Sequence, residues 1–407
     1  MKKITVIGIG YVGLVSGAGI SDFGHRVTCA DIIESKIKLL KNGEIPIYEP
    51  GLYELVDRNV NAGRLSFTTK VDEAIQQADV IFIAVGTPQS DNGEANISAV
   101  ESVARSIGKN LNNYKVICTK STIPVGTGDI ICELIRENMV DGGEFDYVSD
   151  PEFLREGSAV KDFLWPDRVV IGASSIKAFN IMKEVYRPLY VNEKPILHTN
   201  VATAEMIKYA ANAFLATKIS FMNEMSNICE RVGADVNMVR MGIGSDNRIG
   251  YKFIYPGCGY GGSCFPKDIK ALGNTAENNG YTANILQAVE KSGYLMGKDI
   301  FIALDVAASE LYNKADKKYH LISENKTLSS LQLIKYYERL CKQYPIISIE
   351  DGLDQNDWKN WARLTQLLGK EVQIVGDDLT VTNTKLLEKA INNQNINAIL
   401  IKLNQIG

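Results

Sequence analysis

The sequence predicts an α/β protein in three parts: a doubly wound parallel sheet over residues 1–200, a helical segment over 201–285, and part of a β/α barrel over 286–407. Three observations predict it. A glycine-rich turn joins a strand to a helix near the start, a long helical pattern lies in the middle, and strand-like runs ending in charged residues alternate with helices in the last part. At 407 residues the chain is too long for one small core, which favours about two or three domains.

The composition is that of a folded globular protein without a strong charge bias. The apolar fraction is 45%, the charged fraction is 23% and the formal net charge is -4, so nothing indicates binding to nucleic acid or an anionic membrane. Seven cysteines without CxxC spacing argue against a disulfide framework and a zinc cage, and favour a reducing cytoplasm. The apolar run after Lys3 is broken by glycines, so we interpret it as structure and not as a signal peptide.

The beginning of the chain has the pattern of a dinucleotide-binding unit. Residues 3–7 form a β-branched run, Gly8-Ile-Gly-Tyr-Val-Gly13 makes a turn, and Leu14 to Phe23 has a helical pattern. A second strand, Arg26 to Ala30, ends at Asp31, close to the spacing at which an acidic residue meets a ribose. Glycines permit close approach of the backbone, and a helix N-terminus attracts pyrophosphate. The unit predicts a Rossmann-type site, with Asp31 favouring NAD over NADP.

Two later strands end in loops with the same placement. Val80 to Val85 runs into Gly-Thr-Pro at 86–88, and Val116 to Lys120 runs into Ser-Thr-Ile-Pro-Val-Gly at 121–126. Ligands of a doubly wound sheet bind outside the carboxyl ends of its strands, which makes Thr87 and Thr122 cofactor candidates. Capping of the following helix by a threonine is an equally good interpretation of either position.

One cysteine stands out because of its surroundings. Cys264 lies in a glycine-rich loop, Gly257 to Asp268, and Lys267 is a nearby cation that favours the thiolate. The other six cysteines have the ordinary interpretation of small buried hydrophobes, and Cys258, without an adjacent cation, is the natural control. We therefore predict that Cys264 is a nucleophile.

The helical pattern from Ala202 to Arg231 carries a polar pair on an otherwise apolar stretch. Lys208 and Asn212 are four residues apart and lie on one helix face, either in a site or on a solvated stripe. The three histidines, at positions 25, 198 and 320, have no obvious acidic partner motif, so a thiol mechanism is better supplied than a histidine-driven hydride transfer.

Together these segments resemble the UDP-glucose/GDP-mannose dehydrogenase family, over residues 1 to about 285, and are closer to its UDP-glucose 6-dehydrogenase branch. The motifs that carry the resemblance are the glycine turn with Asp31, Tyr48-Glu-Pro-Gly51, Ser121-Thr-Ile-Pro-Val-Gly126, Asp150-Pro-Glu-Phe-Leu-Arg-Glu156, Arg248-Ile-Gly250 and Gly259-Tyr-Gly-Gly-Ser-Cys-Phe-Pro-Lys-Asp268.

The resemblance implies a four-electron oxidation of the 6-hydroxymethyl group of UDP-glucose to a carboxylate, with two NAD reduced in turn and a cysteine thioester on the way. It implies catalytic roles for Cys264, Lys208, Asp268, Asn212, Thr122, Glu152 and Glu156. It implies cofactor contacts for Gly8, Gly10, Tyr11, Val12, Gly13, Asp31, Lys36, Thr87, Thr122, Glu156 and Lys267. It implies substrate contacts for Glu152, Phe153, Leu154, Lys208, Asn212, Arg248, Phe253, Ile254, Tyr255, Pro256, Gly257 and Gly261. It also implies a homodimer formed through the long central helix.

The last part of the chain repeats strands with charged ends: Phe301 to Asp305, Ile346 to Glu350, Val372 to Asp377, and Ala398 to Lys402. This repetition is typical of a TIM-type barrel, whose functional groups lie at the carboxyl ends of the strands. Asp305, Glu350 and Asp377 would form a Mg²⁺ site with Lys402 as base, although any single carboxylate is more often a cap or a solvated charge.

These runs resemble enolase over roughly residues 286–407, through Ala303-Leu-Asp-Val-Ala-Ala-Ser-Glu310, Ser348-Ile-Glu-Asp-Gly352, Val375-Gly-Asp-Asp-Leu379 and Leu400-Ile-Lys-Leu-Asn-Gln-Ile-Gly407. Four strands cannot close an eight-stranded barrel, so we expect exposed sheet edges and no enolase activity. The second Rossmann-like domain of the dehydrogenases has no counterpart here, and the end directly after a strand favours a truncation or an artificial junction. The alternative to an active dehydrogenase is therefore an inactive chimera or a Mg²⁺-binding fragment.

Overall fold

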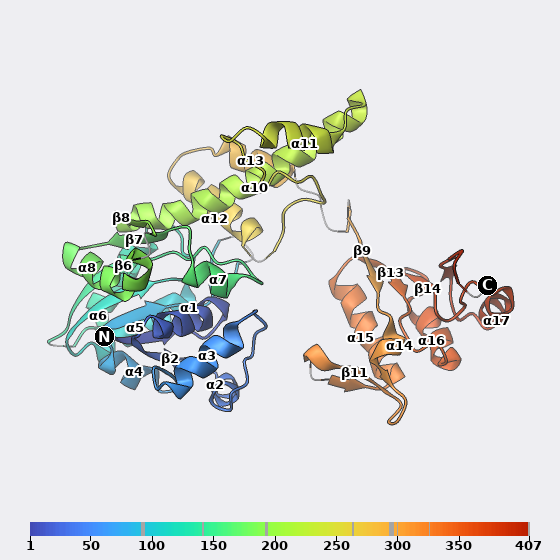
Figure 1. The fold of residues 1–407 in the computed structure, drawn as a ribbon, viewed down its shortest axis with the longest axis horizontal. Helices are drawn as coiled ribbons and strands as arrows, with labels where there is room; N and C mark the ends of the chain where they lie inside the picture. Colours follow the sequence, from blue (N-terminus) through green and yellow to red (C-terminus); the bar gives the residue numbers. More distant parts are fainter. Residues whose placement is uncertain are drawn as a thin grey trace. The chain divides into compact units, whose positions relative to one another are not determined.

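The computed structural model describes residues 1–90, 94–140, 142–191, 194–262, 264–292, 297–298, 300–324 and 326–405. Its contacts divide the chain into two compact units, Met1–Gly293 and Tyr294–Gly407, and Figure 1 shows the elements of each. Within the described residues, no helix is both long and apolar enough to cross a membrane.

The first unit begins with an eight-stranded sheet of order β3-β2-β1-β4-β5-β6-β7-β8. Its strands are β1 (Lys3–Ile7), β2 (Arg26–Ala30), β3 (Leu65–Thr68), β4 (Val80–Ile83), β5 (Tyr114–Thr119), β6 (Glu144–Ser149), β7 (Val169–Ala173) and β8 (Ile196–Thr199). The first six run parallel, which confirms the predicted doubly wound parallel sheet. Strand β7 pairs antiparallel with β6, and β8 then pairs parallel with β7.

Helices cover both faces of this sheet, which explains why its central strands are apolar throughout: every residue of β4 is buried. The helices of this part are α1 (Tyr11–Asp22), α2 (Glu34–Lys41), α3 (Leu52–Asn61), α4 (Val71–Gln77), α5 (Ser98–Asn110), α6 (Thr127–Asn138), α7 (Ala159–Leu164), α8 (Ile176–Val185) and α9 (Arg187–Val191). One core packs α1, α2, α3, α7 and α8 on the first face, and a second core packs α4, α5 and α6 on the other.

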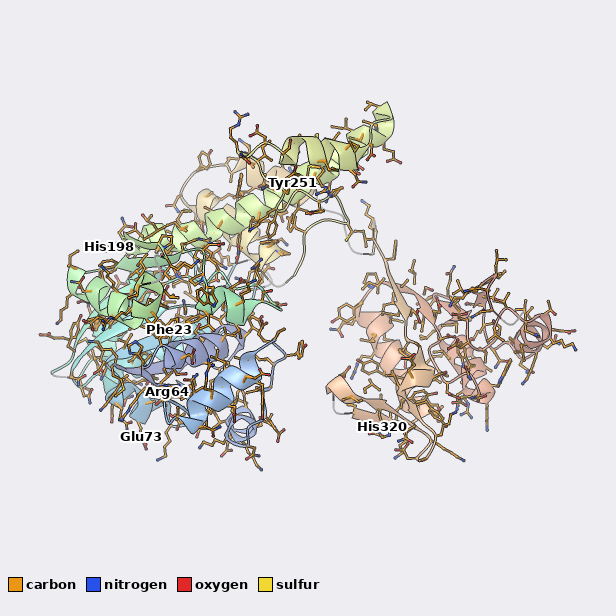
Figure 2. All side chains as sticks on the ribbon, viewed as in Figure 1. Phe23, Arg64, Glu73, His198, Tyr251 and His320 are labelled. Carbon is orange, nitrogen blue, oxygen red and sulfur yellow. The ribbon has the colours of Figure 1, made fainter. Side chains whose placement is uncertain are left out.

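Aromatic contacts fix two of these helices. Phe23, at the end of α1, stacks on Phe163 of α7 with ring centroids 5.7 Å apart, and His198 of β8 stacks on Phe179 of α8 at 3.9 Å (Figure 2). Arg64, also labelled in Figure 2, donates to the carbonyl of Ser21 and ties the start of β3 to α1. These contacts join segments that are distant in the sequence.

A helical layer follows the sheet. It contains α10 (Val201–Val232), α11 (Val236–Gly244), α12 (Phe265–Asn278) and α13 (Asn284–Lys291). Helix α10 has the extent expected from the sequence to within one residue at each end, because Asn200 caps its start and Gly233 adopts a left-handed conformation at its end. A small core of Ala216, Ile269 and Val289 joins α10, α12 and α13.

The second unit has a four-stranded parallel sheet of order β15-β14-β13-β9. The strands are β9 (Ile302–Asp305), β13 (Ile346–Glu350), β14 (Gln373–Gly376) and β15 (Ala398–Ile399), close to the four predicted runs. The helices are α14 (Ala308–Leu311), α15 (Ser330–Gln343), α16 (Trp358–Leu368) and α17 (Thr384–Asn392), with a 3-10 turn η1 (Ile322–Glu324).

One segment of this unit differs from the expected alternation of strands and helices. A three-stranded antiparallel sheet, made of β10 (Tyr312–Asn313), β11 (Lys318–Leu321) and β12 (Lys326–Leu328), lies between β9 and α15. Its buried Tyr319 joins the core around Ile349, Trp361 and Ile374, so the small sheet covers part of the unit's apolar interior. As predicted, the parallel sheet remains open, with β9 and β15 as its edges.

The core of the second unit makes a testable prediction. Trp361 is fully buried and its indole N–H donates to the carbonyl of Asp354 at 3.1 Å. We expect Trp361→Ala to lower the free energy of unfolding of this unit by about 3–5 kcal/mol, measured by denaturant unfolding of the full chain. Trp165→Ala, at an exposed indole of the first unit, is the control. Equal losses from the two variants would contradict a separate core in residues 294–407.

Candidate active site

The glycine turn forms a cradle that side chains would fill. Gly8 has a φ of 94°, and its N–H donates to the carbonyl of Ala30 at 2.9 Å. A Cβ on Gly13 would lie 1.9 Å from the carbonyl oxygen of Gly8, whereas a Cβ on Gly10, the N-cap of α1, would meet nothing within 4 Å. The open space at Gly10, in front of the first N–H groups of α1, fits the approach of a pyrophosphate.

Asp31 lies beside this turn, at the end of β2. Its carboxylate accepts hydrogen bonds from the backbone N–H of Ile9 at 2.8 Å and of Ile33 at 3.0 Å, and Lys36 pairs with it at 3.3 Å. The structure therefore brings together the predicted cofactor residues Asp31 and Lys36, and it shows that Asp31 also braces the glycine turn.

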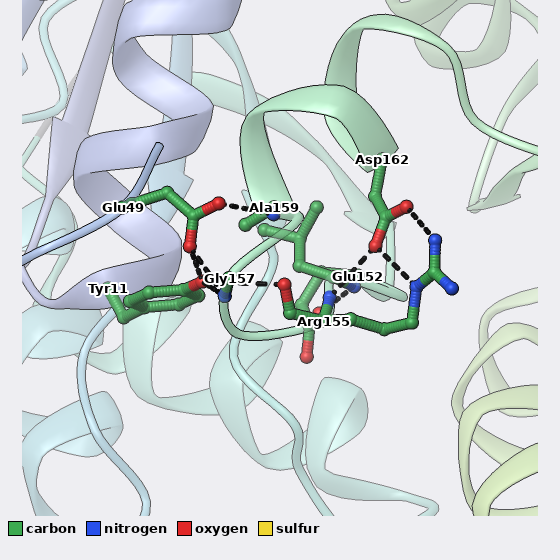
Figure 3. Close-up of polar contacts among 8 residues, drawn as sticks. Tyr11, Glu49, Glu152, Arg155, Gly157, Ala159 and Asp162 are labelled. Carbon is green, nitrogen blue, oxygen red and sulfur yellow. Dashed lines mark hydrogen bonds and ion pairs between the residues drawn. The ribbon is translucent and has the colours of Figure 1, made fainter. Parts of the chain in front are cut away.

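Tyr11, the residue after Gly10, joins the turn to a second motif (Figure 3). Its hydroxyl donates to the carboxylate of Glu49, which is buried and also accepts from the N–H groups of Gly157 at 2.8 Å and Ala159 at 2.7 Å. Burial and the Glu49 carboxylate raise the pKa of Tyr11. Glu49 was not among the predicted site residues, although the motif Tyr48 to Gly51 contained it.

The loop after β6 is held at its other end by an ion pair, also drawn in Figure 3. The Arg155 guanidinium contacts Asp162 at 2.6 Å and 2.9 Å, and this pairing holds the pKa of Asp162 below its usual range. Glu156, a predicted catalytic and cofactor residue, lies exposed between these two anchors.

Thr87 and Thr122 lie side by side at the carboxyl ends of β4 and β5. The hydroxyl of Thr87 donates to the carbonyl of Thr122 at 2.8 Å, and the hydroxyl of Ser121 donates to the carbonyl of Val85 at 2.7 Å. The helices that follow these loops begin after Ile97 and Gly126, so neither threonine caps a helix. The two loops therefore form one edge, as the cofactor interpretation requires.

Lys208 and Asn212 of α10, which the sequence placed either in a site or on a solvated stripe, are buried. Lys208 forms an ion pair with Glu152 at 3.0 Å, and the amide of Asn212 donates to the carboxylate of Asp268 at 2.6 Å. All four side chains are less than a tenth exposed, so the alternative of a solvated stripe is wrong. Asp268 also pairs with Lys267 at 2.7 Å.

Cys264 is the N-cap of α12, one turn before Asp268, and it is exposed. The N–H of Asp268 donates to the carbonyl of Cys264 at 2.9 Å, which ties the thiol's backbone to the buried acid. Cys264 thus lies at the N-terminal end of α12, where the helix dipole favours a negative charge such as that of a thiolate. The structure thus places the predicted nucleophile at the start of the helix that carries Asp268.

Of the remaining predicted substrate residues, Phe153 and Leu154 lie beside the Lys208–Glu152 pair, and the others do not contact it in this way. Phe153 lies between two cations, 5.5 Å from the Lys208 ammonium and 3.7 Å from the Arg168 guanidinium, and the N–H of Leu154 donates to Glu152 at 2.6 Å. Those that lie elsewhere in the helical layer are Arg248, Phe253, Ile254, Tyr255, Pro256, Gly257 and Gly261. The structure does not bring Arg248 to the buried pairs, since its side chain is exposed and paired with Asp246 at 2.5 Å.

Two polar residues of α10 that were not among the predicted site residues, Glu205 and Asn223, hold further loops. Asn223 accepts from the N–H of Gly257 at 2.8 Å, and Glu205 accepts from the N–H groups of Gly126 at 2.8 Å and Gly128 at 3.1 Å. At 100° per residue, positions 205, 208, 212 and 223 lie within about 60° of one another around the helix. A search of the helix face that carries Lys208 and Asn212 for further polar residues would have identified Glu205 and Asn223.

In the second unit, the predicted metal residues gather at one end of the parallel sheet. Asp305 and Glu350 are neighbours across β9 and β13, and burial followed by the charges of Asp305 and Asp377 raises the pKa of Glu350. Among the described residues, however, the acidic group with metal-like spacing is Asp351, Asp377 and Asp378. Asp377 is paired with Lys402, the predicted base, and its other oxygen accepts from Gln405 at 2.5 Å.

Comparison with known families decides the membership of the chain. The family models for the NAD binding domain and the central domain of the UDP-glucose/GDP-mannose dehydrogenase family match residues 2–190 and 202–293. A UDP-glucose 6-dehydrogenase of Rickettsia prowazekii (strain Madrid E) is 44% identical over 293 residues, which are 72% of this chain and 67% of that protein. The chain belongs to the UDP-glucose/GDP-mannose dehydrogenase family. The predicted family is confirmed.

Other relatives agree with this membership. UDP-glucose 6-dehydrogenase TuaD of Bacillus subtilis (strain 168) is 55% identical over 289 residues, 71% of this chain, and the chain spans 62% of the length of that relative. The structure of a UDP-glucose dehydrogenase from Pyrobaculum islandicum aligns with a TM-score of 0.73 and 32% identity, over 98% of this chain and 89% of that one. The family model for the C-terminal TIM barrel domain of enolase matches residues 271–407, which confirms the second predicted resemblance.

The two glycines of the turn offer a matched test of the cofactor cradle. Gly13→Ala places its Cβ against the Gly8 carbonyl, so we expect both a lower midpoint of thermal unfolding and weaker NAD binding. Gly10→Ala meets no atom, so it should keep the midpoint and weaken NAD binding by about tenfold or more, because it occupies the space left for a pyrophosphate. NAD titration calorimetry and thermal unfolding separate the two. Unchanged NAD affinity in Gly10→Ala would disprove the cradle.

Proposed function

We propose that this chain oxidises the 6-hydroxymethyl group of UDP-glucose to a carboxylate, using two NAD and the thiol of Cys264. The observation that carries the proposal is the arrangement on α10 and α12. Asn212 pairs with Asp268 in the first turn of the helix that begins at Cys264, and Lys208 pairs with Glu152 one turn earlier on α10. An exposed thiol beside a buried cation and a buried carboxylate is what a carbon that passes from alcohol to thioester requires.

The glycine cradle supports NAD as the hydride acceptor. When bound there, NAD takes up a hydride from the substrate carbon. Open space at Gly10 faces the start of α1, and the Asp31 carboxylate stands at the end of the neighbouring strand, where a ribose hydroxyl would reach it. Thr87, Thr122, Glu156 and Lys267 are the further residues that we assign to cofactor contacts.

The reaction balances in three steps. The sugar hydroxyl loses its proton and its carbon loses a hydride, which gives an aldehyde. The thiolate of Cys264 adds to the aldehyde carbon, and loss of a second hydride from that carbon turns the hemithioacetal into a thioester. Water then attacks the thioester, the C–S bond breaks, and the products are the carboxylate and the free thiolate. Two hydrides leave, so two NAD are reduced for each sugar.

The buried pairs divide the remaining work between them. The Lys208 ammonium, held by Glu152, stabilises the oxyanion that forms when sulfur adds, and the amide of Asn212 donates to the same region. Asp268, held by Asn212 and Lys267, accepts a proton from the hydroxyl or from the attacking water. Phe153, Leu154 and the loop from Phe253 to Gly257 are assigned to the sugar and its diphosphate.

The role of the Cys264 thiol can be tested by counting NADH. Purified chain with NAD and UDP-glucose should form two NADH per sugar, followed by absorbance. Cys264→Ser should lower the rate by at least about 10³-fold, because a hydroxyl is a far weaker nucleophile toward the aldehyde without an activating base.

Cys258→Ser is the matched control, since Cys258 is also exposed and lies in the same loop. It should leave NADH formation unchanged. NADH formation that survives in Cys264→Ser would remove the covalent mechanism. A folded wild-type chain that binds NAD but forms no NADH would favour the inactive chimera.

We propose that α10 also forms a homodimer interface. Large apolar side chains repeat every seven residues along its exposed side: Phe214, Phe221 and Ile228 are 65%, 48% and 45% exposed. This is the spacing of a helix seam that packs against another helix, and a two-fold axis lets the same stripe serve both copies. Such a stripe is unfavourable in water unless something covers it.

A charge in the centre of this stripe tests the dimer. We expect Phe221→Asp to convert the wild-type dimer to a monomer in light scattering, because both copies would bury a carboxylate without a partner. Tyr53→Asp, at an exposed aromatic residue of α3, is the control and should stay dimeric. A monomeric wild type at micromolar concentration would rule the interface out.

One member of the predicted Mg²⁺ site, Asp377, already has side-chain partners within the second unit. Both oxygens of Asp377 are engaged, by Lys402 and by Gln405, and Asp351 accepts from the N–H groups of Asp377 and Asp378 at 3.0 Å each. A cation bound at Asp377 would therefore share this carboxylate with Lys402 and Gln405. For the location of the chain we propose the cytoplasm, supported by the absence of a disulfide among the cysteines of the described ranges.

A further inference from the structure

Glu205 holds the start of α6 from the side of α10. The residue is 2% exposed, and the two oxygens of its carboxylate accept separately from the N–H of Gly126 at 2.8 Å and of Gly128 at 3.1 Å. Gly126 is the last residue of the loop that carries Thr122, and Gly128 lies in the first turn of α6. One side chain therefore joins the helix of the active site to the loop after β5.

Helices α6 and α10 approach each other closely at Gly128 and Glu205, which leaves little room for either helix to shift. A Cβ on Gly128 would lie 3.0 Å from the Glu205 carboxylate and 2.7 Å from both Tyr147 and Val201, so the glycine lets α6 approach α10. At its other end, the same loop is fixed by the Thr87 hydroxyl, which donates to the carbonyl of Thr122. The loop is thus anchored at Thr122 by Thr87 and at Gly126 by Glu205, and of these two side chains Glu205 is the one that can change its charge.

We propose that Glu205 is a positioning residue, whose ionised carboxylate holds the loop of residues 121–126 in the geometry in which Thr122 faces the active site. This inference rests on the proposed dehydrogenase function. An ionised carboxylate accepts from both N–H groups, whereas a protonated one offers a weaker acceptor at one oxygen, so that one of the two bonds is lost on protonation.

The surroundings of Glu205 make this protonation possible near neutral pH. Burial raises the pKa of Glu205 to about 7, against the lowering effect of the two backbone hydrogen bonds. The titratable groups that face it are Asp129 and Cys132 on α6, Tyr147 on β6 and Tyr209 on α10, and none of these is a cation. Among the residues that the structure describes, the negative charge is thus held by backbone N–H groups at a helix start and by no side-chain cation.

Ionisation of Glu205 strengthens its hydrogen bonds to the loop but lowers the free energy of unfolding. Because the pKa is raised in the folded chain, the fold holds this proton more tightly than the unfolded chain does, and it loses stability as the pH rises from the ordinary carboxyl value towards 7. Above pH 7 the ionised carboxylate costs stability while it secures the loop. A residue whose only role was to stabilise the fold would not show this opposition.

Glu205→Gln is the test, because the amide has the same shape, cannot ionise and accepts at only one oxygen. At pH 8 we expect NADH formation from UDP-glucose to be about tenfold slower than in the wild type, the size of one lost hydrogen bond to a charged group. The ratio of the two rates should fall towards one at pH 6, where the wild-type carboxyl is protonated. The midpoint of thermal unfolding of the variant, relative to the wild type, should rise as the pH increases from 5 to 8.

The matched control is Glu230→Gln, at an exposed residue of the same helix, which should equal the wild type at every pH. A rate ratio between wild type and Glu205→Gln that is constant across this pH range would reduce Glu205 to a structural role. Equal rates at pH 8 would overturn the proposal.

A second measurement does not depend on activity. At pH 8, hydrogen–deuterium exchange of the segment 121–131 should be faster in Glu205→Gln than in the wild type. The reason is that one of the two N–H groups, of Gly126 or Gly128, loses its carboxylate acceptor. If the wild type forms no NADH, the proposed function fails while this comparison still decides the anchoring. Unchanged exchange in that segment would overturn the anchoring itself.

Discussion

Most of the candidate active site depends on one constraint: the polar groups that α10 buries must find partners, because an unpaired polar group in a protein interior is costly. Glu205, Lys208, Asn212 and Asn223 project from one face of the helix; three of them contact different loops, and Asn212 contacts the first turn of α12. Since the spacing along a helix is fixed, these contacts also fix the distances between the loops. A 32-residue helix thus acts as the rigid reference for the threonine loop, the glutamate loop, the start of α12 and the loop at Gly257.

The charges of the site are arranged so that cations and acids meet inside while the thiol stays accessible. Lys208 with Glu152 and Lys120 with Asp150 are both buried ion pairs, and the hydroxyl of Tyr186 also donates to Asp150 at 2.5 Å. Burial raises the pKa of Asp150 in spite of the nearby ammonium. Breaking either pair would leave a buried charge without a partner, which is more costly than the loss of a surface ion pair. The loops after β5 and β6 are therefore fixed in position by electrostatics.

The second unit has its own core and its own cluster of charged side chains. Its helices cover one face of a short parallel sheet and enclose a core around Trp361, while the carboxyl ends of the strands gather Asp305, Glu350 and Asp377 with Lys402. In this unit the Lys402 ammonium pairs with Asp377 and the amide of Gln405 donates to it, so the acidic cluster is stabilised from within the unit. The chemistry proposed for the first unit uses none of these groups. The two halves of the chain are thus distinct in core, in site and in family match.

What the sequence by itself determined is local. The strand, glycine turn and helix at the start, the extent of α10, and the position of Cys264 beside Lys267 and Asp268 follow from short-range patterns, and the structure has them where the patterns predict. The tertiary structure decided the partners: Lys208 meets Glu152 across 56 residues of sequence, Glu205 reaches Gly126 across 79, and β7 pairs antiparallel with β6. No periodicity encodes such contacts, because they depend on how the helices and strands pack and on which buried polar group finds an acceptor. Local spacing therefore named the thiol and its helix, and packing alone showed which loops that helix holds.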